Sequence, residues 1–396
     1  MKKRKTASLL LLLLTTLPLI GCSRSNNKVM ADQYITSVKA HFAPDSRTAL
    51  FEVKAQAHDR GITLTGETNL PEAKAALLDS LASRQIEIMD EIRLLPDANL
   101  EGMTFAIVRN SVANIRSEPS HPAQLSTQAL LGMPLKVLKR QGGWYLVQTP
   151  DDYLSWIDSG GLTLMNEEEY AAWKTSPKLI YLSTFGVAYA EPSVSAARVS
   201  DLVAGNVLKL NGREGHYYRA EFPDGRTAYV SRSEARPFDE WKASLKATEG
   251  SLVATAKTMT GVPYLWGGTS TKGMDCSGFT KTIFFMNGWI IPRDASQQVH
   301  AGESIDTSEG FDNLRPGDLL FFGRPATETS PQRVVHVGMW IGNNEFIHSS
   351  GRVHTSSIDP EAENFDEFNL NRFLEARRYL NHKQGNIIDV AEMYEL

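Results

Sequence analysis

Short runs of β-branched and aromatic residues, separated by turn residues, fill the middle of the chain. Clear examples lie at 135–138, 144–147 and 153–157, with glycine, proline and aspartate between and around them. Runs of this length, broken by such turn residues, are typical of small all-β domains. The pattern therefore predicts a β-barrel of about 60–70 residues.

This β-rich pattern occurs twice at a constant offset. Four separate matches share the spacing from Gly132 to Gly205: that pair itself, Glu118-Pro119-Ser120 and Glu191-Pro192-Ser193, Trp144-Tyr145 and Tyr217-Tyr218, and Pro150-Asp151 and Pro223-Asp224. A constant offset across separate matches indicates duplication of one structural unit. We expect two barrels, at 98–172 and 176–241, and we interpret Trp144, Trp156 and Tyr217 as core aromatics.

A separate block precedes the repeats, at residues 31–97. Alternating apolar and polar residues at 51–55 and 62–66 flank the turn residues Asp59-Arg60-Gly61, which predicts two paired strands. A helix is expected to open at Pro71, with Asn69 or Leu70 as its N-cap, and a third strand follows at 85–89. We expect a small α/β domain of unknown role.

Cys276 stands where a glycine-rich loop gives way to a predicted helix through 280–285. The one other cysteine, Cys22, belongs to a processing signal, so Cys276 has no partner for an intramolecular disulfide or a cysteine metal cluster. A thiol at a helix N-terminus meets the positive end of the helix dipole, which favours the thiolate. Position alone leaves two interpretations, a nucleophile or a buried small hydrophobe.

The segment 333–349 has the pattern of a β-hairpin that carries two histidines. A β-branched and aromatic run at 334–341 is followed by Gly342-Asn343-Asn344, which tolerate positive φ, and by a second run at 345–348. A turn centred on Gly342 places His336 directly opposite His348, with Cβ atoms about 4.5–5.5 Å apart. One imidazole then takes the thiol proton while the other orients it. A two-residue Asn343-Asn344 turn would instead put the histidines on opposite faces.

Five motifs surround these residues: Pro263-Tyr264-Leu265-Trp266-Gly267-Gly268, Asp275-Cys276-Ser277-Gly278-Phe279, Pro292-Arg293-Asp294-Ala295-Ser296-Gln297, Leu314-Arg315-Pro316-Gly317-Asp318-Leu319 and His336-Val337-Gly338. In this order they resemble the NlpC/P60 cysteine peptidases of bacterial cell walls. The resemblance covers about 250–380 and implies a papain-like α+β catalytic domain at 245–380. The whole chain is then a multidomain α+β protein, with the two barrels and the small α/β domain ahead of the catalytic domain.

The resemblance also assigns roles to four side chains. It makes Cys276 the nucleophile, His336 the base and His348 the residue that orients the base. Tyr264 would place its hydroxyl near the developing oxyanion, together with the backbone N–H of Cys276. A preorganised donor of this kind typically lowers the barrier by about 3–4 kcal/mol.

The predicted barrels resemble bacterial SH3-like domains. Two of these ahead of an NlpC/P60 domain look like the dipeptidyl-peptidases that cut the γ-D-glutamyl bond to a diamino acid in peptidoglycan-derived peptides with a free N-terminal L-alanine, releasing L-Ala-D-Glu. The resemblance implies that Asp275 and Ser277 bind the amine. It also implies polar contacts from Glu118 and Tyr153 of the first SH3-like domain, and from Ser296. Taken alone, Glu118 is a turn residue and Tyr153 a barrel-core aromatic.

The start of the chain has the layout of an export signal. Basic residues at 2–5 precede an apolar run at 9–14, and Leu19-Ile20-Gly21-Cys22 resembles a bacterial lipoprotein box. This implies a signal peptide and lipobox at 1–22, lipidation of Cys22, a lipid anchor in the membrane and a flexible tether at 23–30. A plain secretory signal or a spanning anchor is the alternative, although the run is shorter than the roughly 18–20 residues of a spanning helix. We expect the periplasmic face of an outer membrane, or the cell surface.

Composition adds little more. With 396 residues, 42% of them apolar, the chain is long enough for several domains, and a net charge of −5 does not suggest nucleic-acid binding. No His-Glu-x-x-His, Cys-x-x-Cys or Gly-x-x-x-x-Gly-Lys-Ser/Thr motif is present, so we expect no metal and no cofactor. We interpret His300 and His354 as surface or structural residues, and 381–396 as a mobile tail.

Three hypotheses for function follow. The first is a cysteine dipeptidyl-peptidase acting on amine-terminated wall peptides. The second is an endopeptidase that accepts polymeric peptidoglycan. The third is an inactive wall-binding lipoprotein whose SH3-like domains bind the wall, and the intact Cys276, His336 and His348 argue against it.

Overall fold

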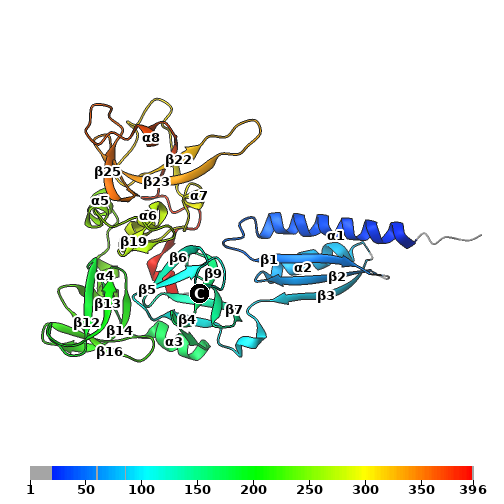
Figure 1. Ribbon diagram of the computed structural model, residues 1–396, viewed down its shortest axis with the longest axis horizontal. Helices are drawn as coiled ribbons and strands as arrows, with labels where there is room; N and C mark the ends of the chain where they lie inside the picture. The colour runs from blue at the N-terminus through cyan, green and yellow to red at the C-terminus, as the bar shows by residue number, and fades with distance from the viewer. Residues whose placement is uncertain (1–19, 59–60, 85, 395–396) are drawn as a thin grey trace, which may run out of the picture. The chain divides into compact units, whose positions relative to one another are not determined.

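The computed structural model describes residues 20–58, 61–84 and 86–394, without the side chains of residues 20–26. The chain divides into two compact units, with the boundary between Leu94 and Leu95 (Figure 1). Among the described helices, none is both long and apolar enough to cross a membrane. Residues 1–19 of the signal peptide and lipobox predicted at 1–22 lie outside the described residues, and so does the side chain of Cys22.

The N-terminal unit is a three-stranded sheet with two helices. Its elements are α1 (Ile20–Phe42), β1 (Phe51–Ala57), β2 (Gly61–Thr68), α2 (Pro71–Ala82) and β3 (Glu87–Leu94). β1 pairs antiparallel with β2, and β2 pairs parallel with β3 through the α2 crossover. Pro71 opens α2 after Leu70, one of the two predicted N-caps, and Ala73, Leu77 and Leu81 form the buried face of this helix.

The flexible tether predicted at 23–30 is wrong, because this segment belongs to α1. Ala31 and Val38 are buried, and Ile35 and Phe42 pack against the same core, so an apolar position recurs every three or four residues. That stripe anchors the helix to the core of the N-terminal unit. The polar residues at 23–28 gave no sign of it, because the stripe begins beyond them.

Two seven-stranded antiparallel sheets open the second unit, after a short 3₁₀ turn η1 (Ala98–Leu100). The first contains β4 (Phe105–Val108), β5 (Val112–Arg116), β6 (Leu125–Leu130), β7 (Pro134–Gln141), β8 (Trp144–Gln148), β9 (Leu154–Asp158) and β10 (Leu162–Met165). The second contains β11 (Lys178–Tyr181), β12 (Phe185–Tyr189), β13 (Arg198–Val203), β14 (Val207–Glu214), β15 (Tyr217–Glu221), β16 (Thr227–Ser231) and β17 (Ala235–Pro237). Helices α3 (Glu167–Thr175) and α4 (Phe238–Ser244) follow the first and second sheets respectively.

The two sheets repeat one design strand by strand. Each strand of the second sheet begins at the same offset from its counterpart in the first, the offset that separates Gly132 from Gly205. The orders are also equivalent, β10-β4-β7-β8-β9-β5-β6 and β17-β11-β14-β15-β16-β12-β13. Gly132 and Gly205, which precede β7 and β14, have φ of 83° and 89°, a region that glycine enters without steric cost. The turn chemistry therefore recurs with the strands, as the sequence repeat indicated.

The rest of the chain builds a helix-and-sheet layer structure. Its helices are α5 (Glu249–Thr258), α6 (Cys276–Met286), α7 (Ala295–Gln298) and α8 (Glu367–Leu370). Its main sheet has the order β21-β26-β22-β23-β24-β25, with bounds Glu303–Ile305, Phe373–Arg378, Leu319–Arg324, Arg333–Gly342, Glu345–Ser350 and Arg352–Ser357. The short strands β18 (Thr269–Ser270) and β19 (Gly273–Met274) form a hairpin just before α6.

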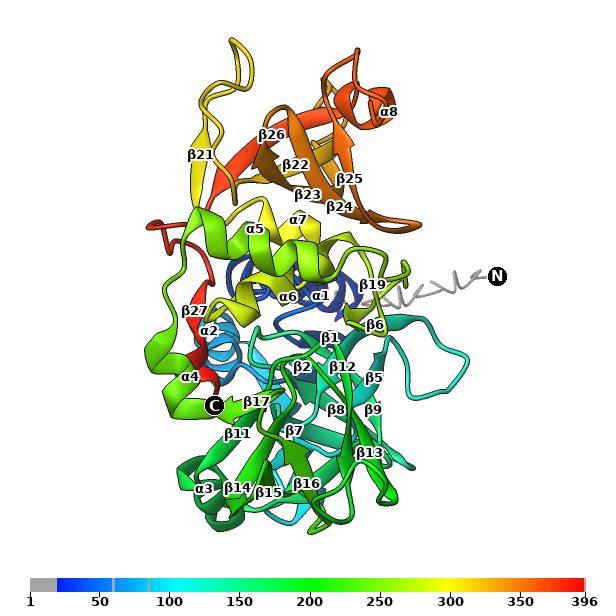
Figure 2. The same ribbon diagram turned by 90° about the vertical axis from the view of Figure 1, so that its left-hand side faces the viewer.

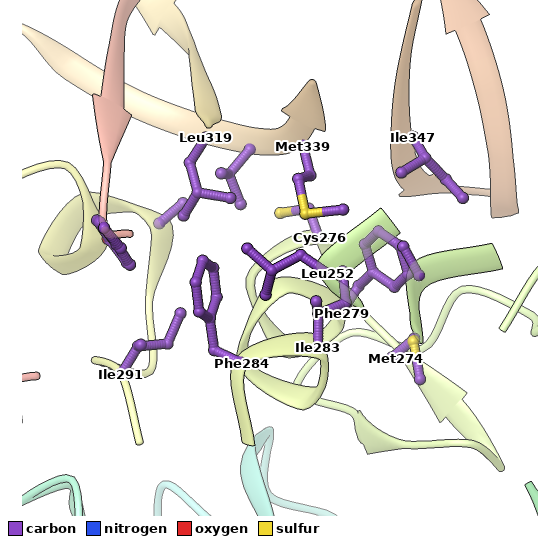
Figure 3. Packing of buried hydrophobic residues seen from close by; sticks show 14 of the residues in the cluster. Leu252, Met274, Cys276, Phe279, Ile283, Phe284, Ile291, Leu319, Met339 and Ile347 are labelled. Atoms are coloured by element: carbon purple, nitrogen blue, oxygen red, sulfur yellow. The ribbon is translucent and has the colours of Figure 1, made fainter. Parts of the chain in front are cut away.

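Helices α5 and α6 cover one side of this sheet (Figure 2). Phe279 and Phe284 of α6 are fully buried against Leu319 and Met339 of the sheet, and Cys276 belongs to the same cluster (Figure 3). The other side of the sheet packs a smaller aromatic cluster around Phe322 and Trp340. The first residue of α6 is thereby held on a rigid core.

Residues 387–394 pack against the rest of the second unit, so the mobile tail predicted at 381–396 is wrong for this part. β27 (Ile388–Asp389) pairs with β20 (Trp289–Ile290), and the 3₁₀ turn η2 (Val390–Tyr394) follows. Met393 is 1% exposed, and Tyr394 donates a hydrogen bond to the carbonyl of Gly132 at 3.0 Å. The segment packs with residues from both seven-stranded sheets and α6: Ile107, Met165, Ile180, Val207 and Phe285. It therefore ties together parts of the second unit that are far apart in sequence.

Replacing Met393 with alanine is expected to lower the free energy of unfolding by about 2–5 kcal/mol, because a fully buried side chain leaves a cavity between these elements. Glu392→Ala is the matched control, since Glu392 lies on the exposed side of the same turn and should change stability by no more than about 0.5 kcal/mol. Urea denaturation of both variants measures the difference. Equal stability of the two variants would contradict the proposal that the C-terminal segment holds these elements together.

Candidate active site

Cys276 is the first residue of α6, and Asp275 is its N-cap. The Oδ1 atom of Asp275 accepts a hydrogen bond from the backbone N–H of Gly278 at 2.7 Å, which satisfies one of the free donors of the first turn. A side chain at Gly278 would meet the carbonyl oxygen of Gly268 at 2.0 Å, so only glycine lets the helix start approach that loop. The local sequence thus fixes the helix start, and with it the position of the thiol.

The thiol of Cys276 is buried and lies against strand β23. Two backbone N–H groups, those of Val337 and Ser277, hydrogen bond its sulfur. Burial and then the neighbouring Asp275 carboxylate nevertheless raise the pKa of the thiol to about 12. The lowered pKa predicted from the helix terminus is wrong, because desolvation and the capping carboxylate outweigh the dipole. The resting site holds a neutral thiol that needs a base.

A β-bulge decides the register of the two histidines. Asn343 and Asn344 have φ of 53° and 60° and form a two-residue turn, with Gly342 paired to Glu345. Beyond it Trp340 pairs with Phe346, so Ile341 is an extra residue on β23. The turn that sequence analysis predicted to separate the histidines is therefore present. The bulge shifts the register by one residue and cancels its effect.

His336 and His348 consequently share one face, but as diagonal neighbours. His348 follows Ile347, which pairs with Met339, so the residue directly opposite His348 is Gly338 and not His336. The direct opposition predicted from a turn centred on Gly342 is wrong. Gly338 leaves room beside His348, and the His336 Nε2 and His348 Nδ1 atoms lie 2.8 Å apart.

These bonds define a proton relay. The Nε2 atom of His348 lies 3.0 Å from the Oγ atom of Ser356 and 3.8 Å from Oδ2 of Asp366. When His348 donates to Ser356 and His336 donates to His348, the Nδ1 atom of His336 is left as an acceptor. Val337, the next residue, donates its N–H to the Cys276 thiol. The arrangement has the parts of a nucleophile, a base and an orienting group.

Burial keeps both imidazoles neutral. It lowers the pKa of His336 well below 6.5, with His348 as the next cause. It also lowers the pKa of His348 to about 4, followed by the effect of His354. His354 lies directly opposite His348 on β25, and the two ring centroids are 4.5 Å apart. A residue interpreted only as surface or structural is therefore in direct contact with the relay, whereas His300 is exposed.

The depressed pKa values predict activity that persists in mild acid. A neutral His336 is needed to accept the thiol proton, so kcat/KM on a wall peptide is expected to change little from about pH 7 to about pH 5. A pH profile of kcat/KM measures this directly. An acid limb with its midpoint near the ordinary histidine pKa of about 6.5 would contradict the buried, neutral base.

The free energy of unfolding, unlike kcat/KM, should decrease in mild acid. The unfolded chain binds a proton at His348 near pH 6.5, whereas the folded chain does so near pH 4. Stability from this group is therefore full above pH 6.5 and is lost as the pH falls, by about 2 kcal/mol at pH 5. Urea denaturation at both pH values, compared with His348→Gln, isolates the contribution. Equal pH dependence of wild type and variant would contradict it.

Tyr264 lies beside the thiol. Its backbone N–H donates to the carbonyl of Gly351 at 2.9 Å, which holds the preceding loop against the β24–β25 hairpin. Burial, and then the charges of Cys276 and Asp275, raise the pKa of its hydroxyl, so the phenol is a neutral donor. This position suits a donor for an oxyanion formed at Cys276.

Asp275 and Arg293 form a buried ion pair behind the nucleophile. Arg293 is 1% exposed, and its Nη2 and Nη1 atoms donate to the two carboxylate oxygens of Asp275 at 2.7 and 3.1 Å. Ser277 accepts from Arg293 at 3.0 Å, and Gly267 donates its N–H to Asp275 at 3.0 Å. The carboxylate predicted to bind a substrate amine is therefore already held by several donors of the protein, which the sequence did not indicate.

The first seven-stranded sheet contacts this end of the site. Thr127 accepts a hydrogen bond from Arg293 at 2.9 Å, and the Oε1 atom of Gln128 accepts from Thr269 and Ser270 at 3.0 Å each. Only one side chain, that of Arg293, stands between Thr127 and the capping Asp275. The first sheet thus lies directly against the nucleophile loop.

Two further contacts join the first sheet to the nucleophile region. Tyr153 donates to Asp294 at 3.2 Å, so its hydroxyl reaches the catalytic side although its ring is buried. Lys281 of α6 forms a buried ion pair with Asp151. Burial lowers the pKa of Lys281, while Asp151 raises it. These contacts come from the turn before β9, the same turn that recurs at Pro223-Asp224 in the second sheet.

Two predicted contact residues remain, Ser296 and Glu118. Ser296 lies in α7, partly buried, two residues from Asp294. Glu118 lies in the exposed loop between β5 and β6, and no hydrogen bond or ion pair of its carboxylate is present among the described residues. The structure therefore places Tyr264 and Val337, the residue after His336, at the Cys276 thiol, and it leaves Glu118 exposed.

A polar network that the sequence did not indicate lies on the far side of the relay. Arg372 donates to Oδ1 of Asn369 at 3.0 and 2.7 Å and lies 4.2 Å from the ring centroid of Phe368. Asn369 in turn bonds Asp366, the carboxylate near His348. The Arg372 charge also helps to lower the pKa of His336. No local motif marks these residues, because only the fold brings 366–372 beside 336 and 348.

No cluster of three potential ligands that could hold a metal ion occurs in the described part of the chain. A helix-borne thiol beside an oriented imidazole pair is the site of a nucleophilic hydrolase. The chain belongs to the NlpC/P60 family: the model of that family matches residues 261–368. A second model, the bacterial dipeptidyl-peptidase SH3 domain, matches residues 115–162, within the first seven-stranded sheet.

Three known proteins place this assignment in context. A γ-D-glutamyl-L-lysine dipeptidyl-peptidase of Bacillus cereus is 30% identical over 275 residues, which is 65% of this chain and 76% of that protein. A murein DD-endopeptidase/LD-carboxypeptidase of Escherichia coli is 38% identical over 125 residues, 31% of this chain and 57% of that protein. The crystal structure of an NlpC/P60 family protein from Bacillus cereus aligns with a TM-score of 0.59 at 26% identity, covering 70% of this chain and 99% of that one.

Proposed function

We propose that this protein is a cell-wall cysteine peptidase that hydrolyses the bond between γ-D-glutamate and a diamino acid. Its substrate is a peptidoglycan stem peptide with a free N-terminal L-alanine, and its product is L-Ala-D-Glu. The observation that carries the proposal is the contact of the first seven-stranded sheet with the nucleophile loop through Thr127 and Arg293. We place the substrate cleft between the thiol and the first sheet, where so near a boundary favours short peptides over a continuous polymer.

The reaction follows from the relay. His336 Nδ1 takes the Cys276 proton as the sulfur attacks the γ-carbonyl, and Tyr264 with the backbone N–H of Cys276 stabilises the oxyanion. The tetrahedral intermediate collapses to a thioester when His336 returns the proton to the departing amine of the diamino acid. Water, deprotonated by His336, then attacks the thioester and releases the dipeptide, which restores the thiol. His348 holds the base in the tautomer that this sequence needs.

The free amine would be recognised at the end of the cleft bounded by the first sheet. Asp275, Ser277, Tyr153, Glu118 and Ser296 are the proposed contacts. We add Asp294, because its side chain is 26% exposed and it accepts the hydrogen bond of Tyr153. A carboxylate with solvent access is suited to an ammonium ion. A stem whose alanine is amide-linked to muramic acid lacks that charge.

The relatives support this choice over the endopeptidase alternative. The dipeptidyl-peptidase similarity extends over 65% of the chain, beyond the catalytic domain, whereas the endopeptidase similarity covers 31%. In addition, the match of the bacterial dipeptidyl-peptidase SH3 model at 115–162 includes Thr127, the residue of the first sheet that contacts Arg293. We further propose export, lipidation at Cys22 and attachment to the cell envelope, on the periplasmic face of an outer membrane or at the cell surface.

Product analysis tests the function. Purified protein is incubated with L-Ala-γ-D-Glu-meso-diaminopimelate, with its N-acetylated form and with intact peptidoglycan, and products are identified by mass spectrometry. We expect L-Ala-D-Glu from the free-amine peptide alone. Equal cleavage of the acetylated peptide would overturn the free-amine requirement, and cleavage of intact peptidoglycan would establish the endopeptidase. Binding to peptidoglycan without cleavage of any substrate would favour the inactive wall-binding protein.

A further inference from the structure

The second seven-stranded sheet carries a cationic cavity away from the catalytic residues. The cavity has a volume of about 580 Å³, and its lining includes His216, Tyr218, Arg232, Arg236 and Glu240. Its side chains come from two turns, one between β14 and β15 and one between β16 and β17, and from β15, β17 and α4. The chain as a whole has a net charge of −5, so three basic side chains in one hollow stand out from their surroundings.

The floor of the cavity is preorganised. The Arg232 guanidinium lies 5.7 Å from the ring centroid of Tyr218, and its Nη1 atom donates to the carbonyl of Gly215 at 3.0 Å. Arg213 lies 5.5 Å from the same ring, and it pairs with Glu240 at 3.4 Å. The Glu240 carboxylate is therefore paired with Arg213, which is not in the lining. Arg232 is held by the Tyr218 ring and the Gly215 carbonyl, and neither group neutralises its charge.

The first sheet supplies an internal comparison, because it has the same fold at the constant offset of the repeat. It keeps the supporting residues: Tyr145, Arg140 and Glu167 occupy the positions of Tyr218, Arg213 and Glu240. Arg140 even lies 5.8 Å from the ring of Tyr145, as Arg213 does from Tyr218. The arginine–tyrosine contact thus belongs to the shared scaffold.

The basic residues of the cavity do not belong to that scaffold. At the offset of the repeat, His216 corresponds to Gly143 of the first sheet, Arg232 to Ser159 and Arg236 to Thr163. The fold therefore forms without a basic residue at any of the three positions. Their charge has to be explained by something other than the stability of the sheet.

We propose that this cavity binds an oxyanion of the cell wall, a carboxylate or a phosphate, and so attaches the second sheet to the wall independently of Cys276. Guanidinium groups bind both anions with paired N–H donors, and His216 adds a further donor. Stem-peptide carboxylates and phosphate-containing wall polymers are the two sources of this chemistry. The first sheet bounds the catalytic cleft, and the second, with the same fold, holds the enzyme near its substrate.

The test uses the residues of the first sheet as replacements. His216→Gly, Arg232→Ser and Arg236→Thr are combined in the full chain, because the first sheet accommodates these residues at the same positions. The control carries Arg198→Gln and Arg219→Gln, two exposed arginines of the second sheet outside the cavity, and it loses the same number of guanidinium groups. Circular dichroism checks that both variants are folded.

Two probes distinguish the sources. Inorganic phosphate is titrated by calorimetry, and peptidoglycan stripped of phosphate polymers is used in co-sedimentation at low salt. We expect the affinity of the triple variant for one probe to fall at least about tenfold. The affinity of the control for both probes, and the kcat/KM of both variants on the tripeptide, should stay unchanged. Loss for phosphate alone identifies a phosphate polymer, and loss for stripped peptidoglycan identifies stem carboxylates. Wild-type affinity of the triple variant for both probes, or equal loss in the control, overturns the proposal.

Discussion

Replacing Cys276 with alanine is expected to lower kcat/KM for the tripeptide by about 10⁴-fold or more, while the fold is retained. Among the described side chains, Cys276 has the only thiol that can form the thioester, and its loss leaves His336 without a proton to accept. The side chain is small and buried, so the alanine variant removes little packing and should unfold near the wild-type temperature. Steady-state kinetics and thermal unfolding of the same preparation measure both properties.

His300→Ala is the matched control for this variant. His300 is an exposed histidine in the same domain, and no change in kcat/KM is expected. Cys276→Ala with activity within tenfold of wild type would remove the sulfur from the mechanism. The site would then have to use water activated by His336 directly.

Replacing Arg293 with methionine is expected to lower the free energy of unfolding by about 3–5 kcal/mol, because it leaves the buried Asp275 carboxylate without its counter-ion. The guanidinium donates to Asp275, Ser277 and Thr127 at once, so the variant also frees the first sheet from the nucleophile loop. Activity should fall together with stability, since Asp275 caps the helix that presents the thiol. Urea denaturation and kcat/KM on the tripeptide measure the two effects.

Two companion variants separate the roles of Arg293. Thr127→Val removes one hydrogen bond to the first sheet and should cost about 1–3 kcal/mol. Arg293→Lys keeps the charge but loses the paired donors, so we expect an effect between those of the other two. If Arg293→Met were no less stable than Thr127→Val, the ion pair behind the nucleophile would not have the structural role given to it here.

The sequence predicted most where local chemistry sets the geometry. The constant offset of the repeat recurs in every strand of the two sheets because glycine, proline and aspartate fix the turns between them. The helix start near Cys276 was likewise predicted from the glycine-rich loop before it, and the structure adds that Asp275 is the N-cap. Where turn residues and caps determine the backbone, a single sequence is informative.

The hairpin shows where local pattern stops being sufficient. Both possible turns were compatible with Gly342-Asn343-Asn344, but one placed His336 and His348 on the same face and the other placed them on opposite faces. The structure combines the two-residue turn with a bulge at Ile341, which returns His336 and His348 to one face. A bulge has no sequence signature here, because it depends on packing against both neighbouring strands.

The errors at the two ends have a common physical cause. The α1 helix and the C-terminal segment are both held by tertiary burial, the first through Ala31 and Val38 and the second through Val390 and Met393. Each segment is short or polar in sequence, and its partners lie far away along the chain. The same holds for Arg372, which approaches the histidines only because β26 is a neighbour of β22 in the sheet.

Alkylation of the Cys276 thiol tests directly whether this sulfur is the nucleophile. Wild-type protein is treated with iodoacetamide, and remaining activity is compared with the fraction of Cys276 modified, located by peptide mapping that separates it from Cys22. Because burial raises the pKa of this thiol, labelling should be slow and should quicken as the pH rises. We predict that activity falls in proportion to the modification of Cys276. Bound tripeptide should protect the thiol from alkylation and so preserve the activity. Full activity in protein whose Cys276 is completely alkylated would contradict the role of this sulfur as the nucleophile.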